Sequence, residues 1–207
     1  MPDRRRSLGL AAALAAVLAG GRQASGQEAV GEAAQLEGGV LVIRGGRIEP
    51  LALNGPVFVD DIVRTATDGR VLIRCRDGLR IAIGSGSEVA VRTYLADTAN
   101  GSLEAALGLL RGIVRLIGGD SLQRQWIEVD TRTAVASVRS TEWLVESTER
   151  GTGVLSLEGV VEVVGLAGGR VLLRPGEGTD VPPGAPPRAV ARWGDARRLN
   201  AIARTAF

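Results

Sequence analysis

The chain has 207 residues, with 25 basic and 23 acidic residues, no histidine and only 3% aromatic residues. This length fits one domain of ordinary size together with terminal segments. Every basic residue is arginine. Four of the 25 arginines and one of the 23 acidic residues lie in the first 26 residues, which leaves 21 arginines against 22 acidic residues in the rest. Because that remainder is near neutral and its arginines are scattered singly, the composition argues against nucleic-acid binding.

The amino terminus has the pattern of an export signal. Arg4–Arg6 form a positive segment, Leu8–Ala19 form an apolar segment, and Ala24–Gly26 offer small residues before a cleavage point. We expect cleavage after Gly26, so that residues 1–26 are a signal peptide, the mature chain begins at Gln27 and the protein is periplasmic or secreted. The apolar segment is shorter than the roughly 20 residues that a membrane-spanning helix needs, so no stable membrane span is expected after cleavage. The Sec and twin-arginine export routes both remain open.

We expect one β domain over residues 27–181. From Gly38 to Val181 the chain repeats one pattern, in which a turn glycine or Asp-Gly precedes three to six residues that alternate or are apolar throughout. The pattern is typical of short strands separated by tight turns. In residues 77–83 the alternation predicts a half-buried strand, with Leu79, Ile81 and Ile83 inside and Arg80 and Ala82 outside. The other strands are expected after Gly39, Gly69, Gly112, Gly153, Gly159 and Gly169, and from Glu88.

The spacing of these glycines predicts an all-β domain of short strands in a β-solenoid-like stack, in which each turn of chain buries one aliphatic face against the next. A β-sandwich gives a similar strand spacing and remains the alternative. Residues 102–111 carry leucines at helical spacing, but Gly108 and Gly112 disfavour a helix, since each interior glycine costs about 1 kcal/mol there. We therefore expect a strand in this segment.

The carboxyl-terminal residues 182–207 differ in composition. Pro182–Pro187 contain four prolines, which predicts an extended linker rather than a strand. Asp195 is expected to cap a short helix from Ala196 to about Thr205, with Leu199, Ile202 and Ala203 on one face. We expect this helix to dock on its own domain.

The single cysteine, Cys75, lies between Arg74 and Arg76 in an alternating segment. It has no partner for an internal disulfide. The alternation predicts a small buried side chain between two exposed arginines rather than a reactive thiol.

Catalytic chemistry has little support in the composition. The absence of histidine excludes Ser-His-Asp and Cys-His nucleophilic sites and histidine-zinc sites. Gly84–Ser87 are glycine-rich, but the chain has no lysine for a phosphate-binding loop, so a turn is expected there. A catalytic site that uses carboxylates alone, as in glycosidases, remains formally possible. The acidic residues considered for it are Asp60, Asp61, Asp68, Asp77, Asp120 and Asp130. We predict no enzyme, no catalytic residue and no cofactor or metal site.

Several segments, taken in order between Val57 and Val181, resemble the FecR family, the periplasmic domain of iron-citrate type regulators that also occurs as a separate exported module. The resemblance is carried by residues 63–71, 77–81, 126–131, 134–145, 154–163 and 171–177. The segment Arg139-Ser140-Thr141 stands where the family has Arg-Gly-Thr. The resemblance implies an all-β, non-enzymatic domain in which Arg139, Thr141 and Gly159 hold turns.

The regulators carry a cytoplasmic anti-sigma segment and a membrane helix ahead of this domain, and we expect neither here. Our hypothesis is an exported, non-catalytic module that binds an envelope protein or a cell-envelope component. The alternative is a sensory periplasmic component that works with a separately encoded membrane regulator.

Overall fold

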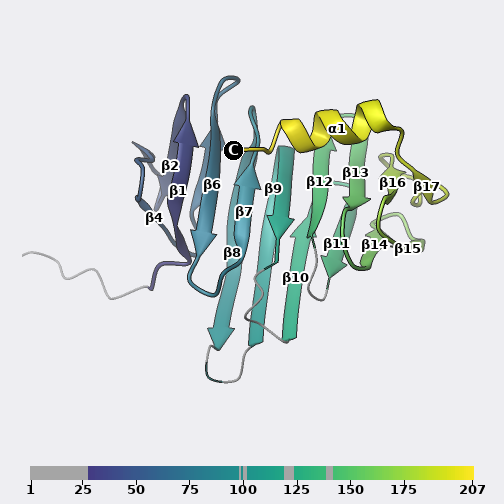
Figure 1. Cartoon of the computed structure of the whole chain (residues 1–207), viewed down its shortest axis with the longest axis horizontal. Coiled ribbons are helices and arrows are strands. Elements are labelled where there is room, and N and C mark those ends of the chain that lie inside the picture. Colours follow the sequence, from purple (N-terminus) through teal and green to yellow (C-terminus); the bar gives the residue numbers. More distant parts are fainter. Residues whose placement is uncertain (1–27, 98, 100–101, 119–123, 139–141) are drawn as a thin grey trace, which may run out of the picture.

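The fold is all-β with one short helix near the carboxyl terminus, as the computed structural model shows (Figure 1). The structure describes residues 28–97, 99, 102–118, 124–138 and 142–207. The predicted signal peptide and the segment Arg139–Thr141 lie outside the described residues. The first nine strands are β1 (Gly31–Glu37), β2 (Val40–Arg44), β3 (Arg47–Pro50), β4 (Pro56–Val57), β5 (Ile62–Thr65), β6 (Arg70–Cys75), β7 (Arg80–Ile83), β8 (Glu88–Asp97) and β9 (Ser102–Ile117). The others are β10 (Arg124–Asp130), β11 (Ala134–Val138), β12 (Glu142–Thr148), β13 (Gly151–Ser156), β14 (Val161–Gly165), β15 (Arg170–Leu173), β16 (Glu177–Val181) and β17 (Ala191–Arg192), followed by the helix α1 (Asp195–Ala203).

The strands form two layers that are joined through β9. The first layer has the order β4-β1-β6-β7-β9-β12-β13-β16-β17. The second has the order β3-β2-β5-β8-β9-β10-β11-β14-β15. Among these described pairings, only β9 with β10 is parallel. The all-β prediction is confirmed. The chain alternates between layers as it advances along the molecule, as in a solenoid, but its neighbouring strands are mostly antiparallel, as in a sandwich.

The strand β9 passes from one layer to the other near its middle. Its first part, up to Arg111, pairs with β8, and residues from Gly112 onward pair with β12 in the other layer. Gly112 has a φ of 92°, a conformation that a residue with a side chain rarely adopts. The expectation of a strand over residues 102–111 is therefore confirmed, and Gly112 marks the crossing.

The main core lies between the layers and is built from aliphatic side chains around a fully buried Trp143. The predicted alternation in residues 77–83 is confirmed for Leu79, Ile81 and Ile83, which are buried. Ala82, expected outside, is also buried, at 1% exposure. The carboxyl-terminal end of the chain lies beside β6 and β7 (Figure 1), so the outer face of this part of the sheet is covered.

The helix α1 docks on the outer face of the first layer, as expected, where Ile113, Leu144, Leu155 and Trp193 form a second, smaller core with Ala201. The expected helix cap was wrong. The residue at the cap position is Gly194, without a side-chain hydrogen bond, and Asp195 lies in the first turn instead.

The docked face of α1 also differs from the expected one. It carries Ala201, whereas Leu199 is 56% exposed. Arg197 pairs with Asp180 at 2.6 Å and Arg204 pairs with Glu146 at 2.5 Å. These ion pairs link the helix and its carboxyl-terminal end to β16 and β12, and the short Ala201 side chain allows the helix backbone to approach the sheet.

Candidate functional site

The strands β8, β9 and β10 extend beyond their neighbours at one end of the molecule (Figure 1). Their pairing register aligns side chains in rows across the three strands. One row joins Ala96, Leu103 and Gln125, and the neighbouring row joins Leu95, Glu104 and Trp126. Because successive strand residues point to opposite faces, the first row faces the interior and the second faces outward. Burial agrees, since Leu103 is 3% exposed and Leu95 is 62% exposed.

A cleft of about 880 Å³ lies between these projecting ends and the residues that precede β1. Its volume is within the range of small-ligand sites in proteins. The apolar wall comprises Val30, Val59, Tyr94, Ala96 and Leu103. The polar groups at the cleft include Glu28, Arg76, Asp97, Glu104 and Gln125.

The Tyr94 side chain that lines the cleft is uncharged. Burial raises the pKa of the Tyr94 phenol far above its ordinary value, and the neighbouring Cys75 thiol and Asp77 carboxylate reinforce this shift. Burial also raises the pKa of the Cys75 thiol to about 12. Both groups are therefore protonated at neutral pH.

The rim of the cleft carries more acidic than basic groups. Glu28, Asp97 and Glu104 contribute carboxylates, whereas Arg76 is the basic residue among the described lining residues and it pairs with Glu28. Asp97 also accepts a hydrogen bond from the backbone N–H of Ala99 at 3.0 Å. The cleft therefore presents an apolar wall beside an acidic rim.

Trp126 lies at this rim with 40% of its surface exposed. The other two tryptophans are buried, Trp143 in the main core and Trp193 under the helix. Exposed tryptophan is a frequent anchor in protein recognition because it buries a large area on contact. Sequence reasoning did not single out this cleft. The signal was present in the alternation of β10, which places Trp126 opposite to the buried Ile127 and Val129.

Apart from the neighbouring Asp60 and Asp61, the described acidic residues considered for catalysis lie on separate elements. Asp61 accepts two hydrogen bonds from Arg44, Asp77 accepts one from the backbone N–H of Leu79, and Asp130 pairs with Arg92 at 2.5 Å. Each of these three is engaged in a structural contact. Asp60 and Asp68 lie in turns, and Asp120 lies outside the described residues. Within the described ranges, no group of three or more Cys, Asp or Glu side chains is placed to hold a metal ion.

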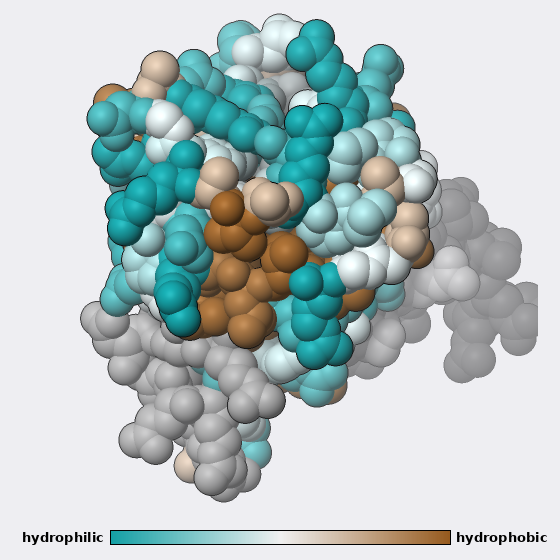
Figure 2. Space-filling model, turned by 90° about the vertical axis from the view of Figure 1, so that its right-hand side faces the viewer, coloured by the Kyte–Doolittle hydropathy of each residue, from teal (hydrophilic) through white to brown (hydrophobic). Residues whose placement is uncertain are grey.

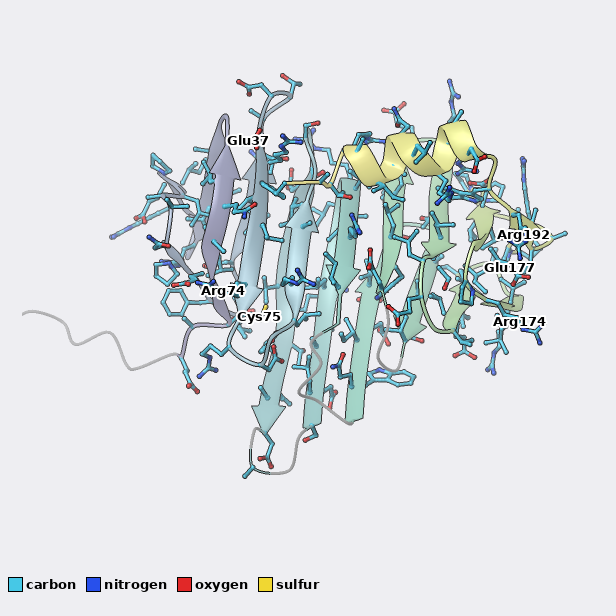
Figure 3. All side chains as sticks on the ribbon, viewed as in Figure 1. Glu37, Arg74, Cys75, Arg174, Glu177 and Arg192 are labelled. Atoms are coloured by element: carbon cyan, nitrogen blue, oxygen red, sulfur yellow. The ribbon has the colours of Figure 1, made fainter. Side chains whose placement is uncertain are left out.

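The other predictions about single motifs agree with the structure. Cys75 is buried at 3% exposure between exposed Arg74 and Arg76. Figure 3 shows Arg74 and Cys75 near the end of β6. Gly84–Ser87 form a turn, in which the Ser87 N–H donates to Thr65 Oγ1 at 2.9 Å. Gly159 has a φ of 70° and its carbonyl accepts a hydrogen bond from the Ser156 hydroxyl at 3.0 Å, so it holds a turn.

Residues 61–162 match the family model described as FecR protein. The chain is a FecR-domain protein. The matched residues include β8, β9 and β10, and hence most of the cleft. They do not include β15, β16, β17 or α1. No curated protein sequence matches the chain.

Two crystal structures of a candidate anti-sigma factor from Parabacteroides distasonis resemble this FecR-domain protein. The TM-scores are 0.50 and 0.52, and the sequence identity is 16% in both cases. Each alignment covers 69% of this chain, and 64% and 63% of the respective crystallised chains. This chain thus spans less than two thirds of the length of those structures. At this identity the structural likeness shows a shared fold alone. Among the described residues, no helix has the length and apolar character needed to cross a bilayer.

Proposed function

We propose that this FecR-domain protein is an exported, non-catalytic binding module that recognises an envelope protein or a component of the cell envelope through the cleft beside β8, β9 and β10. The observation that supports this most directly is the combination of the cleft with the exposed Trp126 and Leu95. The buried phenol at this cleft, Tyr94, stays protonated at neutral pH, which supports a binding role.

The chemistry of the cleft indicates the kind of segment that it binds. Val30, Val59 and Leu103 accept an apolar side chain. The rim keeps a net negative charge after Glu28 pairs with Arg76, and this charge favours a basic group beside the apolar one. A protein segment that carries an apolar residue next to lysine or arginine fits both features. The signal peptide that the sequence predicts at residues 1–26 supports a location where such partners are envelope proteins.

Site-specific photocrosslinking in the source cells tests this proposal. A photoreactive amino acid at Leu95 or Trp126 is expected to give a discrete covalent adduct with an envelope component. The same group at Ile48 on β3, which is similarly exposed at 61% but lies far along the strand order, serves as the matched control. Adducts of equal yield from all three positions, or none from Leu95 and Trp126, would contradict the proposal.

Export is tested separately by the amino-terminal sequence of the protein isolated from cells. A mature chain that begins at or near Gln27 in the periplasmic or secreted fraction is expected. A chain that retains Met1 in the cytoplasm would rule out the exported role but would leave the binding cleft testable by the crosslinks.

A second candidate function is a sensory component of a cell-surface signalling system that works with a separately encoded membrane regulator. It is favoured by the likeness to structures described as anti-sigma factors. Genes for a sigma factor and an outer-membrane receptor beside this gene would favour the signalling role. Their absence would favour the general binding module.

A further inference from the structure

The strand β15 forms an open edge of the second layer. It pairs with β14 from Arg170 to Leu173, and no pairing register of β15 with a further strand is described. Pro186 and Pro187 lie against Gly169, the residue directly before the strand. The opposite layer ends nearby in the two-residue strand β17. One side of β15 therefore presents backbone N–H and C=O groups that have no strand partner among the described residues.

The middle of this edge carries none of the proline or charged residues that protect a free edge strand. The edge strand at the other end of the layer, β3, consists of Arg47, Ile48, Glu49 and Pro50, and proline and charged residues block the addition of a further strand. The central residues of β15 are instead apolar, with Val171, Leu172 and Leu173 in succession. The two edges of one layer thus differ in their capacity to accept a partner strand.

The surface around β15 is apolar as well. Leu172 and Leu166 are 57% and 62% exposed, and Val171 and Val190 pack on the main core while remaining partly exposed. Figure 2 views this end of the molecule and shows apolar surface gathered at its centre with hydrophilic residues around it. A strand added to β15 would cover this surface while satisfying the backbone groups of the edge.

Arginines lie at both ends of the edge. Arg170 begins β15 and Arg174 directly follows it. Arg192 of β17 lies close to the turn at Gly176, and Figure 3 shows Arg174 and Arg192 at the same end of the molecule. Arg170 pairs with Glu162 at 3.1 Å, whereas Arg174 and Arg192 take part in none of the described ion pairs. The Glu177 carboxylate lies at the same end and accepts a hydrogen bond from the Arg174 N–H at 2.8 Å. Three arginines therefore face two carboxylates, those of Glu162 and Glu177, and the edge keeps one excess positive charge for its occupant.

These charges disfavour a second copy of the chain as the occupant. A symmetric antiparallel pairing of two β15 strands centred on Leu172 would place Arg170 of one copy opposite Arg174 of the other. Like charges directly opposite each other destabilise a strand pair. An occupant with acidic residues at the corresponding positions would be stabilised by the same arginines.

We propose that β15 is a docking edge for an extended, acidic segment of another protein, which adds to the second layer as a further strand. The apolar residues of the segment cover Leu172 and Val171, and its flanking carboxylates pair with Arg170 and Arg174. This mode of recognition draws its affinity from main-chain hydrogen bonds and its specificity from alternate side chains. The edge lies outside the cleft residues, so it is a second surface that does not depend on the cleft.

Synthetic peptides labelled with a fluorophore test the edge by anisotropy. The probe is a nine-residue peptide of alternating valine and threonine with glutamates near both ends, and the comparison peptides replace the glutamates by lysines or the central valine by proline. We expect the acidic peptide to bind at least about tenfold more tightly than either comparison peptide, because both the charge pairs and the strand hydrogen bonds contribute. Equal binding of the acidic and lysine peptides would overturn the proposal.

Matched variants locate the peptide on the molecule. Leu172→Glu is expected to weaken binding of the acidic peptide about tenfold, and Arg170→Glu with Arg174→Glu is expected to reverse the preference toward the lysine peptide. Ile48→Glu on the β3 edge is the control and should leave binding unchanged. Circular dichroism melting of each variant checks that it is folded, and the charge-reversal variant provides a gain of binding that misfolding would not produce.

Two further outcomes would contradict the proposal. Equal losses from Ile48→Glu and Leu172→Glu would show that the peptide does not select β15. Concentration-dependent dimerisation of the wild-type protein in sedimentation velocity, abolished by Leu172→Glu, would assign the edge to a second copy of the chain instead.

Discussion

Arg44 donates hydrogen bonds to both carboxylate oxygens of Asp61, from Nε to Oδ1 at 2.8 Å and from Nη2 to Oδ2 at 2.7 Å. The Asp61 carboxylate is almost fully buried, at 1% exposure, and it also accepts a bond from the Phe58 N–H at 2.8 Å. The hydrogen bond to Asp61 raises the pKa of Arg44. This pair joins β2 to the turn before β5, and it shows that Asp61 has a structural role.

Asp61→Asn is expected to lower the free energy of unfolding by about 2 kcal/mol, because the Arg44 guanidinium loses its charged acceptor. The loss is moderate because Arg44 is partly exposed and water still solvates it. Urea denaturation measures the change. Glu37→Gln is the control, since its ion pair with Arg70 is exposed and should contribute less than about 1 kcal/mol. A loss from Asp61→Asn no greater than that of the control would show that the buried pair does not stabilise the fold.

Cys75 should be inert toward thiol reagents in the folded protein. Burial raises the pKa of its thiol to about 12 from the ordinary value of 9.0, and the thiolate is the reactive species. At pH 8 we expect labelling by a chromogenic disulfide to be slow in buffer and complete within minutes in concentrated urea. Since the folded pKa exceeds the unfolded one, the stability that this group contributes below about pH 9 should be lost as the pH rises toward 12. Rapid labelling of the native protein would contradict the burial of Cys75.

Gly112 allows β9 to cross between the layers, so it should not tolerate a side chain. Its φ is 92°, and an added Cβ would lie 2.5 Å from Ser87 Cα. Gly112→Ala is expected to cost about 3 kcal/mol or more, because strain adds to a steric clash with a buried residue. Gly86 has a φ of 64° but open space around it, so Gly86→Ala should cost only about 1 kcal/mol. Thermal melts that rank the two variants in the opposite order would show that Gly112 is not the constraint.

Glu128 should respond to pH through its environment on β10. Desolvation raises its pKa, and the nearby Asp130 carboxylate adds to the shift. A raised folded pKa means that ionised Glu128 destabilises the protein as the pH rises above the unfolded value near 4.5. Glu128→Gln is therefore expected to raise the free energy of unfolding at pH 7 by less than about 1 kcal/mol, because Glu128 is partly exposed, and to have no effect at pH 3. Asp130→Asn relieves the same repulsion but breaks the Arg92 ion pair, so it should not stabilise. A gain from Glu128→Gln that persists at pH 3 would argue for another cause.

The docking of α1 should depend on Ala201 and not on Leu199. Ala201 is 3% exposed and packs beside Trp193, whereas Leu199 is 56% exposed. Ala201→Arg is expected to displace the helix and shift Trp193 fluorescence to longer wavelength, because water then reaches the indole ring. Leu199→Arg should leave the spectrum and Tm within experimental error. A spectral shift from Leu199→Arg of the same size would mean that the helix docks on the face that the hydrophobic pattern indicated.

Local alternation was enough to predict much of the secondary structure. Leu79, Ile81 and Ile83 are buried and Asp77 holds the turn before them, because a period of two and a turn residue are properties of a few neighbouring residues. The burial of Cys75 follows from the same short-range pattern. The sequence also carried the FecR resemblance, since its motifs are local.

Only the tertiary structure decided which residues from distant segments meet. Alternation shows that one face of a strand is buried but does not identify the element that covers it, so the burial of Ala82 and the rotation of α1 could not be predicted from it. The cleft combines Val30, Tyr94 and Leu103 with Gln125, and these four residues come together through strand pairings over long stretches of chain. The open edge at β15 likewise follows from the order of strands in a layer. Strand order is set by the packing of the whole chain, whereas strand formation is set by the residues within each segment.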